Sequence, residues 1–100
     1  MDMQKLMKQA QKMQKEMNQA QAKLQEMEVE GVAGGGVVKV TATGGNAIKA
    51  IEIAPEVVDP EEVEMLQDLI LAAINDAMSK ANQLANNEMG KITGGMKMPF

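Results

Sequence analysis

The first 27 residues carry the most regular alternation of apolar and polar positions in the chain. Apolar residues recur there in alternating steps of three and four over four heptads, with no Gly or Pro between them. These positions, the apolar seam, are Met3, Leu6, Ala10, Met13, Met17, Ala20, Leu24 and Met27. The spacing predicts a long amphipathic helix, and the seam requires a second helix against which it can be buried.

The segment after this helix changes to the alternation typical of strands. Three strands are predicted, over residues 28–33, 37–43 and 47–53. Glycines at 34–36 join the first two strands, and Gly44-Gly45-Asn46 makes a tight hairpin turn into the third. A phosphate-binding loop is the alternative for the triple-glycine run. It is disfavoured because a strand follows the run and no Lys-Ser/Thr pair completes a P-loop.

The third predicted strand has an irregular apolar pattern, because Ile51 and Ile53 share a parity that Ile48 does not. Two interpretations stay open: a register break near Lys49 and Ala50, or a strand half-buried on both faces. The second strand is regular, and its predicted inner face consists of Val38, Val40 and Ala42.

A second long helix is predicted to begin at Asp59-Pro60, with Asp59 as N-cap, and to end at Gly90. Glu61 and Glu62 lie at the positive end of its macrodipole, so capping explains these carboxylates better than a metal or acid–base site does. The many alanines of this helix would let another helix approach closely. Its predicted apolar face consists of Val63, Leu66, Ile70, Ala73, Ile74, Ala77, Ala81 and Leu84.

The order helix, three antiparallel strands, helix predicts an α+β fold. We expect one domain over residues 1–90, followed by a flexible Gly-rich tail over residues 91–100. Three strands leave two free edges, which predicts a homodimer formed through the sheet. The first helix is expected to pack along the second.

Composition narrows the range of functions. The chain has neither Cys nor His, so no zinc or iron ligand set, no cofactor and no nucleophile–base pair is expected, and the protein is predicted not to be an enzyme. No apolar run approaches the length that spans a bilayer, which predicts a cytoplasmic protein without membrane contact. A single aromatic residue removes the stacking platforms typical of single-strand binders.

Charge is distributed unevenly along the chain. The net charge is -4, yet residues 1–27 carry +2 and residues 55–89 carry -7. Four lysines in the first helix, Lys5, Lys8, Lys12 and Lys15, recur at helical spacing away from the apolar seam, and we call them the lysine stripe. The stripe is either a solvated outer face or a surface that contacts phosphates.

Three runs of sequence resemble a known family over essentially the whole chain. They are EVEGVAGGGVVKVTATGGNAIKAIEI, PEVVDPEEVEMLQDLILAAINDAMSKA and MGKITGG. The chain resembles the YbaB/EbfC family of bacterial nucleoid-associated proteins, which are small DNA-binding dimers. The resemblance implies a tweezer-like homodimer, in which the sheets join across the two-fold axis and the long helices project as arms toward DNA.

The resemblance also implies a site, a partner and a location. Its DNA-binding residues are expected among lysines on the arms: Lys5, Lys8, Lys12, Lys15, Lys23, Lys80 and Lys91. Without Arg or aromatic stacking, binding to duplex DNA is expected to be largely insensitive to sequence, with effects on gene expression or chromosome organisation in the nucleoid. The alternative is a protein-interaction module for recombination or replication proteins, without direct DNA contact.

Overall fold

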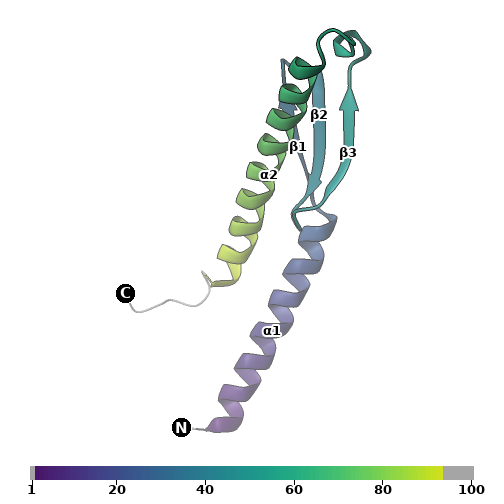
Figure 1. Ribbon diagram of the computed structural model, residues 1–100. Helices are drawn as coiled ribbons and strands as arrows, with labels where there is room; N and C mark the ends of the chain where they lie inside the picture. Colours follow the sequence, from purple (N-terminus) through teal and green to yellow (C-terminus); the bar gives the residue numbers. More distant parts are fainter. Residues whose placement is uncertain (1, 94–100) are drawn as a thin grey trace, which may run out of the picture.

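The computed structural model describes residues 2–93, which form two long helices and a three-stranded sheet (Figure 1). The predicted α+β fold is confirmed. Helix α1 (Met3–Glu26) leads into strands β1 (Glu28–Ala33), β2 (Val38–Thr43) and β3 (Ile48–Ile53), and the 3-10 helix η1 (Pro55–Val57) precedes helix α2 (Val63–Thr93). Helix α2 lies along one face of the sheet, while α1 extends beyond its end, giving an elongated molecule of 70 × 26 × 16 Å.

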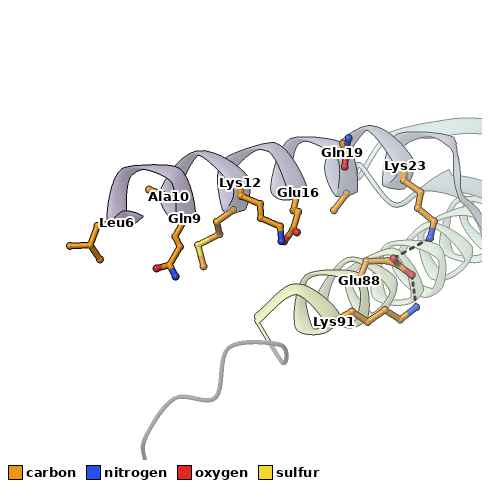
Figure 2. A pocket seen from close by; sticks show the side chains of 11 residues that line it. Leu6, Gln9, Ala10, Lys12, Glu16, Gln19, Lys23, Glu88 and Lys91 are labelled. Atoms are coloured by element: carbon orange, nitrogen blue, oxygen red, sulfur yellow. Dashed lines mark hydrogen bonds and ion pairs between the residues drawn. The ribbon is translucent and has the colours of Figure 1, made fainter. Parts of the chain in front are cut away.

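Helix α1 begins with Asp2 as N-cap, whose carboxylate accepts from the Gln4 amide at 3.1 Å, and only its C-terminal end is packed. Leu24 is buried against the β2–β3 turn, whereas Met3 near the other end is 75% exposed. The expectation that α1 packs along α2 therefore holds only for the last turns of α1. Figure 2 shows the preceding turns lying beyond the end of α2.

The sheet is antiparallel with the order β1-β2-β3, as predicted. A β-bulge lies in the second hairpin, because Thr41 pairs with Ala50 while the next residue, Ala42, pairs with Ile48. Lys49 is the extra residue, which confirms a register break there and excludes a strand half-buried on both faces. All three isoleucines of β3 consequently share the face of the sheet on which α2 packs.

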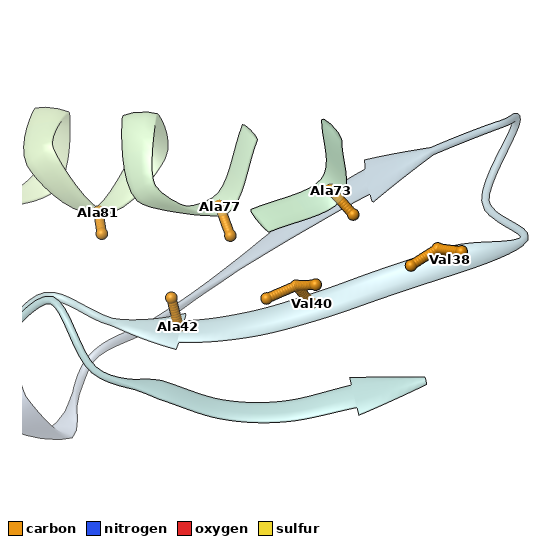
Figure 3. Close-up of a cluster of buried hydrophobic side chains, with 6 residues drawn as sticks. All are labelled: Val38, Val40, Ala42, Ala73, Ala77 and Ala81. Carbon is orange, nitrogen blue, oxygen red and sulfur yellow. The ribbon is translucent and has the colours of Figure 1, made fainter. Parts of the chain in front are cut away.

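The core lies between α2 and the inner faces of β1 and β2 (Figure 3). Its fully buried side chains are Val38, Val40, Ala42, Ala73, Ala77 and Ala81. Ala73, Ala77 and Ala81 of α2 face the sheet, so these three alanines bring the helix close to a sheet and not to another helix. Small side chains on both layers bring the helix backbone very near the sheet, and Gly31 of β1 lies at the closest point.

Gly31→Ala should destabilise the fold strongly, by roughly 3 kcal/mol, because there is no room for a methyl group. A Cβ at this position would lie 2.3 Å from the carbonyl oxygen of Ala73 and 2.3 Å from the amide nitrogen of Ala77. Chemical denaturation followed by circular dichroism measures the loss. Gly90→Ala is the control: among residues 2–93, nothing beyond the local helix backbone lies within 4 Å of its Cβ position, and alanine there should raise stability by up to about 1 kcal/mol.

Both predicted ends of α2 need correction. Asp59 caps a separate turn, since its Oδ1 accepts from the Glu61 amide at 2.9 Å, and the helix itself begins at Val63. Gly90 does not end the helix, which continues to Thr93, because Gly90 does not adopt the left-handed backbone conformation of a glycine C-cap. The tail predicted over residues 91–100 therefore begins inside a helix, and its residues 94–100 lie outside the described part of the chain.

Candidate nucleic-acid interface

The lysine stripe runs along the part of α1 that extends from the rest of the molecule. All four of its side chains are exposed, and none makes an ion pair or side-chain hydrogen bond within residues 2–93. An ammonium group without an internal partner exchanges only water and counterions for a phosphate. These lysines are therefore available to an external anion at little cost.

The three other lysines of the predicted site are engaged with carboxylates of α2. Lys23 and Lys91 lie 3.6 and 3.1 Å from Glu88, as the dashed lines in Figure 2 mark. Lys80 lies 3.1 Å from Asp76 and also donates to the carbonyl oxygen of Glu30 in β1 at 2.9 Å. The seven predicted residues thus form two groups, four free lysines on α1 and three neutralised ones.

Glu88 is the residue that sequence reasoning missed. Its side chain is about 10% exposed and bridges the two helices, because it contacts Lys23 of α1 and Lys91 of α2. The hydrogen bond from Lys91 lowers the pKa of Glu88 below its usual value of 4.5, and the charge of Lys23 acts in the same direction against partial desolvation. Its only signal in the sequence is an acid among apolar and amide residues late in the second helix.

Asp76 secures α2 to the edge of β1 in a similar way. Its carboxylate accepts a hydrogen bond from the Val32 amide at 3.0 Å and pairs with Lys80. The backbone hydrogen bond from Val32, followed by the bond from Lys80, lowers the pKa of Asp76 below its usual value of 3.8. These bonds occupy outward-facing backbone groups of β1, so this edge of the sheet is protected from pairing with another strand.

The lowered pKa of Glu88 makes the α1–α2 contact sensitive to acid. A carboxyl whose pKa is lower in the folded state stabilises that state above its unfolded pKa, and the contribution disappears as the pH falls through the folded value. Between about pH 6 and pH 3, wild-type protein should therefore lose more unfolding free energy than Glu88→Gln. Urea titrations at both pH values measure this. Glu56→Gln is the control. Its unfolding free energy should fall between the two pH values by as much as that of wild type, because no ion pair engages Glu56 within residues 2–93.

Lys39 is a further cation that the predicted site does not include. It is exposed on β2, next to Val32 and Glu52 in the register, on the sheet face opposite α2. No ion pair engages it within residues 2–93. Strand alternation around the buried Val38 and Val40 is the sequence signal that places it outward. Lys39 is distant from the lysine stripe in the sequence, and it forms no row with other unpaired lysines.

Within residues 2–93, no three acidic side chains gather closely enough to hold a metal ion, and no helix is long and apolar enough to cross a bilayer. Of the acids near the start of α2, Asp59 accepts a hydrogen bond in the preceding turn, and Glu64 lies in the first turn of the helix. What distinguishes the described surface is a row of unpaired cations on a projecting helix.

Comparison with known proteins decides the family. The model of the YbaB/EbfC DNA-binding family matches residues 1–96. The chain belongs to this family. A protein named "Nucleoid-associated protein" from Pelotomaculum thermopropionicum is 55% identical over 98 residues, covering 98% of this chain and 93% of that one. Another of that name, from Ruminiclostridium cellulolyticum, is 59% identical over 95 residues, covering 95% and 83%.

The fold of this YbaB/EbfC-family chain also has a solved counterpart. The crystal structure of the uncharacterized protein HP0035 from Helicobacter pylori superposes with a TM-score of 0.83, covering 94% of this chain and 99% of that one at 24% identity. Family and relatives together indicate a nucleoid-associated DNA-binding protein and not an enzyme.

Proposed function

We propose that the chain binds duplex DNA as a homodimer, with the lysine stripe of each α1 contacting backbone phosphates. The observation that carries this proposal is that the stripe is free of ion pairs within residues 2–93, while the three other predicted lysines are paired with carboxylates of α2. Acidic α2 repels phosphate, which favours an approach of DNA from the α1 side. The DNA-bound dimer is then the form of the protein that is located in the nucleoid.

The homodimer is proposed to form through β3. Its three isoleucines, Ile48, Ile51 and Ile53, are 43%, 46% and 36% exposed although they lie on the inner face of the sheet, because α2 covers only β1 and β2. No group within residues 2–93 bonds to the outer edge of β3, whereas α2 side chains protect the edge of β1. An open edge beside an uncovered apolar face supports pairing of β3 with β3 of a second copy.

The chemistry of the stripe supports binding that depends little on base sequence. Lysine contacts phosphate as a point charge, and the chain has no Arg for bidentate recognition of guanine. Binding through phosphates alone fixes position on the duplex without reading bases. Any effect on gene expression then arises from occupancy or from the arrangement of bound DNA.

Titration of labelled duplexes with the protein at two salt concentrations tests this function. A dimer presents two stripes, and contact of about half of their lysines with phosphates predicts a slope of log affinity against log salt near -3 to -4, so affinity should fall roughly a hundredfold between about 50 and 200 mM. Two duplexes of unrelated sequence should bind within a few-fold of each other. An affinity that does not change with salt, or an absence of binding at about 50 mM, would overturn the proposal and favour a protein-interaction role.

A further inference from the structure

The direction in which α1 projects is set at the C-terminal end of the helix. A single residue, Met27, lies between α1 and β1, and its backbone is extended. The Gly44 amide of the β2–β3 turn donates to the carbonyl oxygen of Met27 at 3.0 Å. Leu24 is 3% exposed and packs on the same turn, where a Cβ on Gly44 would lie 2.8 Å from the Leu24 side chain. The β2–β3 turn is therefore the pivot from which α1 projects.

Glu88 of α2 contacts the same end of α1 from a different element. Its carboxylate lies 3.6 Å from Nζ of Lys23 and 3.1 Å from Nζ of Lys91 (Figure 2). Within residues 2–93, the pair of Lys23 with Glu88 is the one ion pair that joins the two helices. Because the Glu88 side chain is only about 10% exposed and Lys91 of the same helix holds it, Glu88 offers Lys23 a fixed anchor.

The two helices separate beyond Glu88. A groove of about 880 Å³ lies between them, and its lining consists of Glu88 and Lys91 on the α2 side and of α1 residues otherwise. The apolar side chains of α1 become more exposed with distance from the pivot, from 38% at Met17 to 46% at Leu6 and 75% at Met3. In the described structure, the part of α1 that carries the lysine stripe is thus held from the other end of the helix.

The length of α1 makes the stripe sensitive to its angle at this end. Lys5 lies 18 positions before Lys23, which is about 27 Å at the helical rise per residue. A swing of α1 by about 20° at its base therefore displaces Lys5 by about 9 Å. Successive phosphates of one strand are about 3.4 Å apart along the duplex axis. A small change of angle consequently changes which phosphates the stripe can contact.

We propose that Glu88 is a positioning residue for DNA binding, which fixes the angle of α1 by holding Lys23. This inference rests on the proposed function, because it requires that the lysine stripe contacts phosphates. When two stripes bind one duplex, each must point in a direction that lets both make contact. The apparent affinity falls in proportion to the fraction of molecules in that direction, so an angle fixed before DNA arrives favours binding.

Glu88→Gln separates positioning from charge, because the two effects on DNA binding have opposite signs. The substitution removes an acid and releases Lys23 and Lys91, so charge alone would strengthen binding. Loss of positioning weakens it: if the productive angle then makes up about a fifth of the ensemble, the apparent Kd rises about fivefold. Glu56→Gln is the matched control. It changes the charge equally where no ion pair is lost within residues 2–93, and it should bind at least as tightly as wild type.

The angle itself is measured without DNA. The chain has no Cys, so Gln11→Cys on α1 and Ser79→Cys on α2 provide two exposed sites for spin labels. Dilution with unlabelled protein restricts the distances measured by electron–electron resonance to those within one chain. The distance distribution should broaden or shift in Glu88→Gln and stay as in wild type in Glu56→Gln. Lys23→Gln should broaden it too, because it breaks the same ion pair from the exposed side and leaves Glu88 paired with Lys91.

The two measurements also separate the failure of this inference from the failure of the proposed function. A distance distribution that is unchanged in both Glu88→Gln and Lys23→Gln would overturn the positioning role. So would DNA binding by folded Glu88→Gln that is as tight as in wild type or tighter. Wild-type protein that does not bind duplex DNA would instead overturn the proposed function, and the positioning role with it.

Discussion

Replacing all four lysines of the lysine stripe by Gln should weaken binding of duplex DNA by roughly a hundredfold or more at about 50 mM salt. The stripe is the only row of lysines on the described surface that is not already neutralised by a neighbouring carboxylate. Removing it also removes the source of released counterions, so the salt slope should fall from near -3 to -4 toward zero. Titrations by anisotropy or mobility shift over a range of salt concentrations measure both quantities.

Two double variants that change the net charge equally test whether DNA binding depends on the position of the lysines or on the net charge of the chain. Lys8→Gln with Lys15→Gln changes the charge of the chain as much as Lys39→Gln with Lys49→Gln does. The first pair lies on the stripe, while the second lies on the sheet, where Lys49 contacts Glu28 at 2.8 Å. Only the first pair should lower affinity and flatten the salt slope. Equal losses in both would mean that general charge and not the stripe governs binding.

The substitutions on the stripe should leave the fold unchanged. All four side chains are exposed and make no contact that the described structure needs. Circular dichroism and the mass of the assembly should match wild type. If the quadruple variant is folded and still binds with wild-type affinity and slope, the stripe is a solvated face. The contact would then lie elsewhere, or the protein-interaction reading would take precedence.

Local patterns predicted the elements well because their causes are local. The seam spacing located α1, and the alternation around Val38 located β2, since both patterns follow directly from helical and strand periodicity. The ends of α2 were predicted less well. A capping Asp and a Gly each fit more than one local structure, and the fold used Asp59 for a separate turn and kept Gly90 inside the helix.

The sequence alone did not predict which charged side chains from distant parts of the chain form contacts. Lys23 and Glu88 stand far apart in the chain, and so do Lys80 and Glu30, so their contacts depend on how α2 crosses the sheet and meets α1. These contacts decide which of the predicted DNA-binding lysines are free. The sequence did not predict the exposure of β3 either, because this exposure arises from the position of α2, which covers only two of the three strands.

Ile51→Glu should convert the proposed dimer into a monomer. Ile51 is 46% exposed in the single chain, on the inner face of β3 where a second copy would cover it. An unpaired carboxylate buried in such a contact costs about 2 kcal/mol or more, and a dimer carries two. A total of about 4 kcal/mol raises the dissociation constant about a thousandfold. Sedimentation equilibrium at tens of micromolar measures the change.

Val32→Glu is the matched control for this variant. Val32 is similarly exposed, at 40%, but lies on β1 and on the opposite face of the sheet, where it pairs in register with Lys39. A Glu opposite a Lys on neighbouring strands is favourable, so this variant should remain dimeric. A wild-type protein that sediments as a monomer, or equal dissociation of both variants, would rule out β3 as the interface.

The same variant links the dimer to DNA binding. A monomer presents one lysine stripe to the duplex where the dimer presents two, so about half of the phosphate contacts remain. Ile51→Glu should therefore bind with a salt slope near half the wild-type value, even though every lysine of the stripe is present. A slope that stays at the wild-type value in a proven monomer would show that one α1 makes all the contacts, and that the second arm is not used to hold DNA.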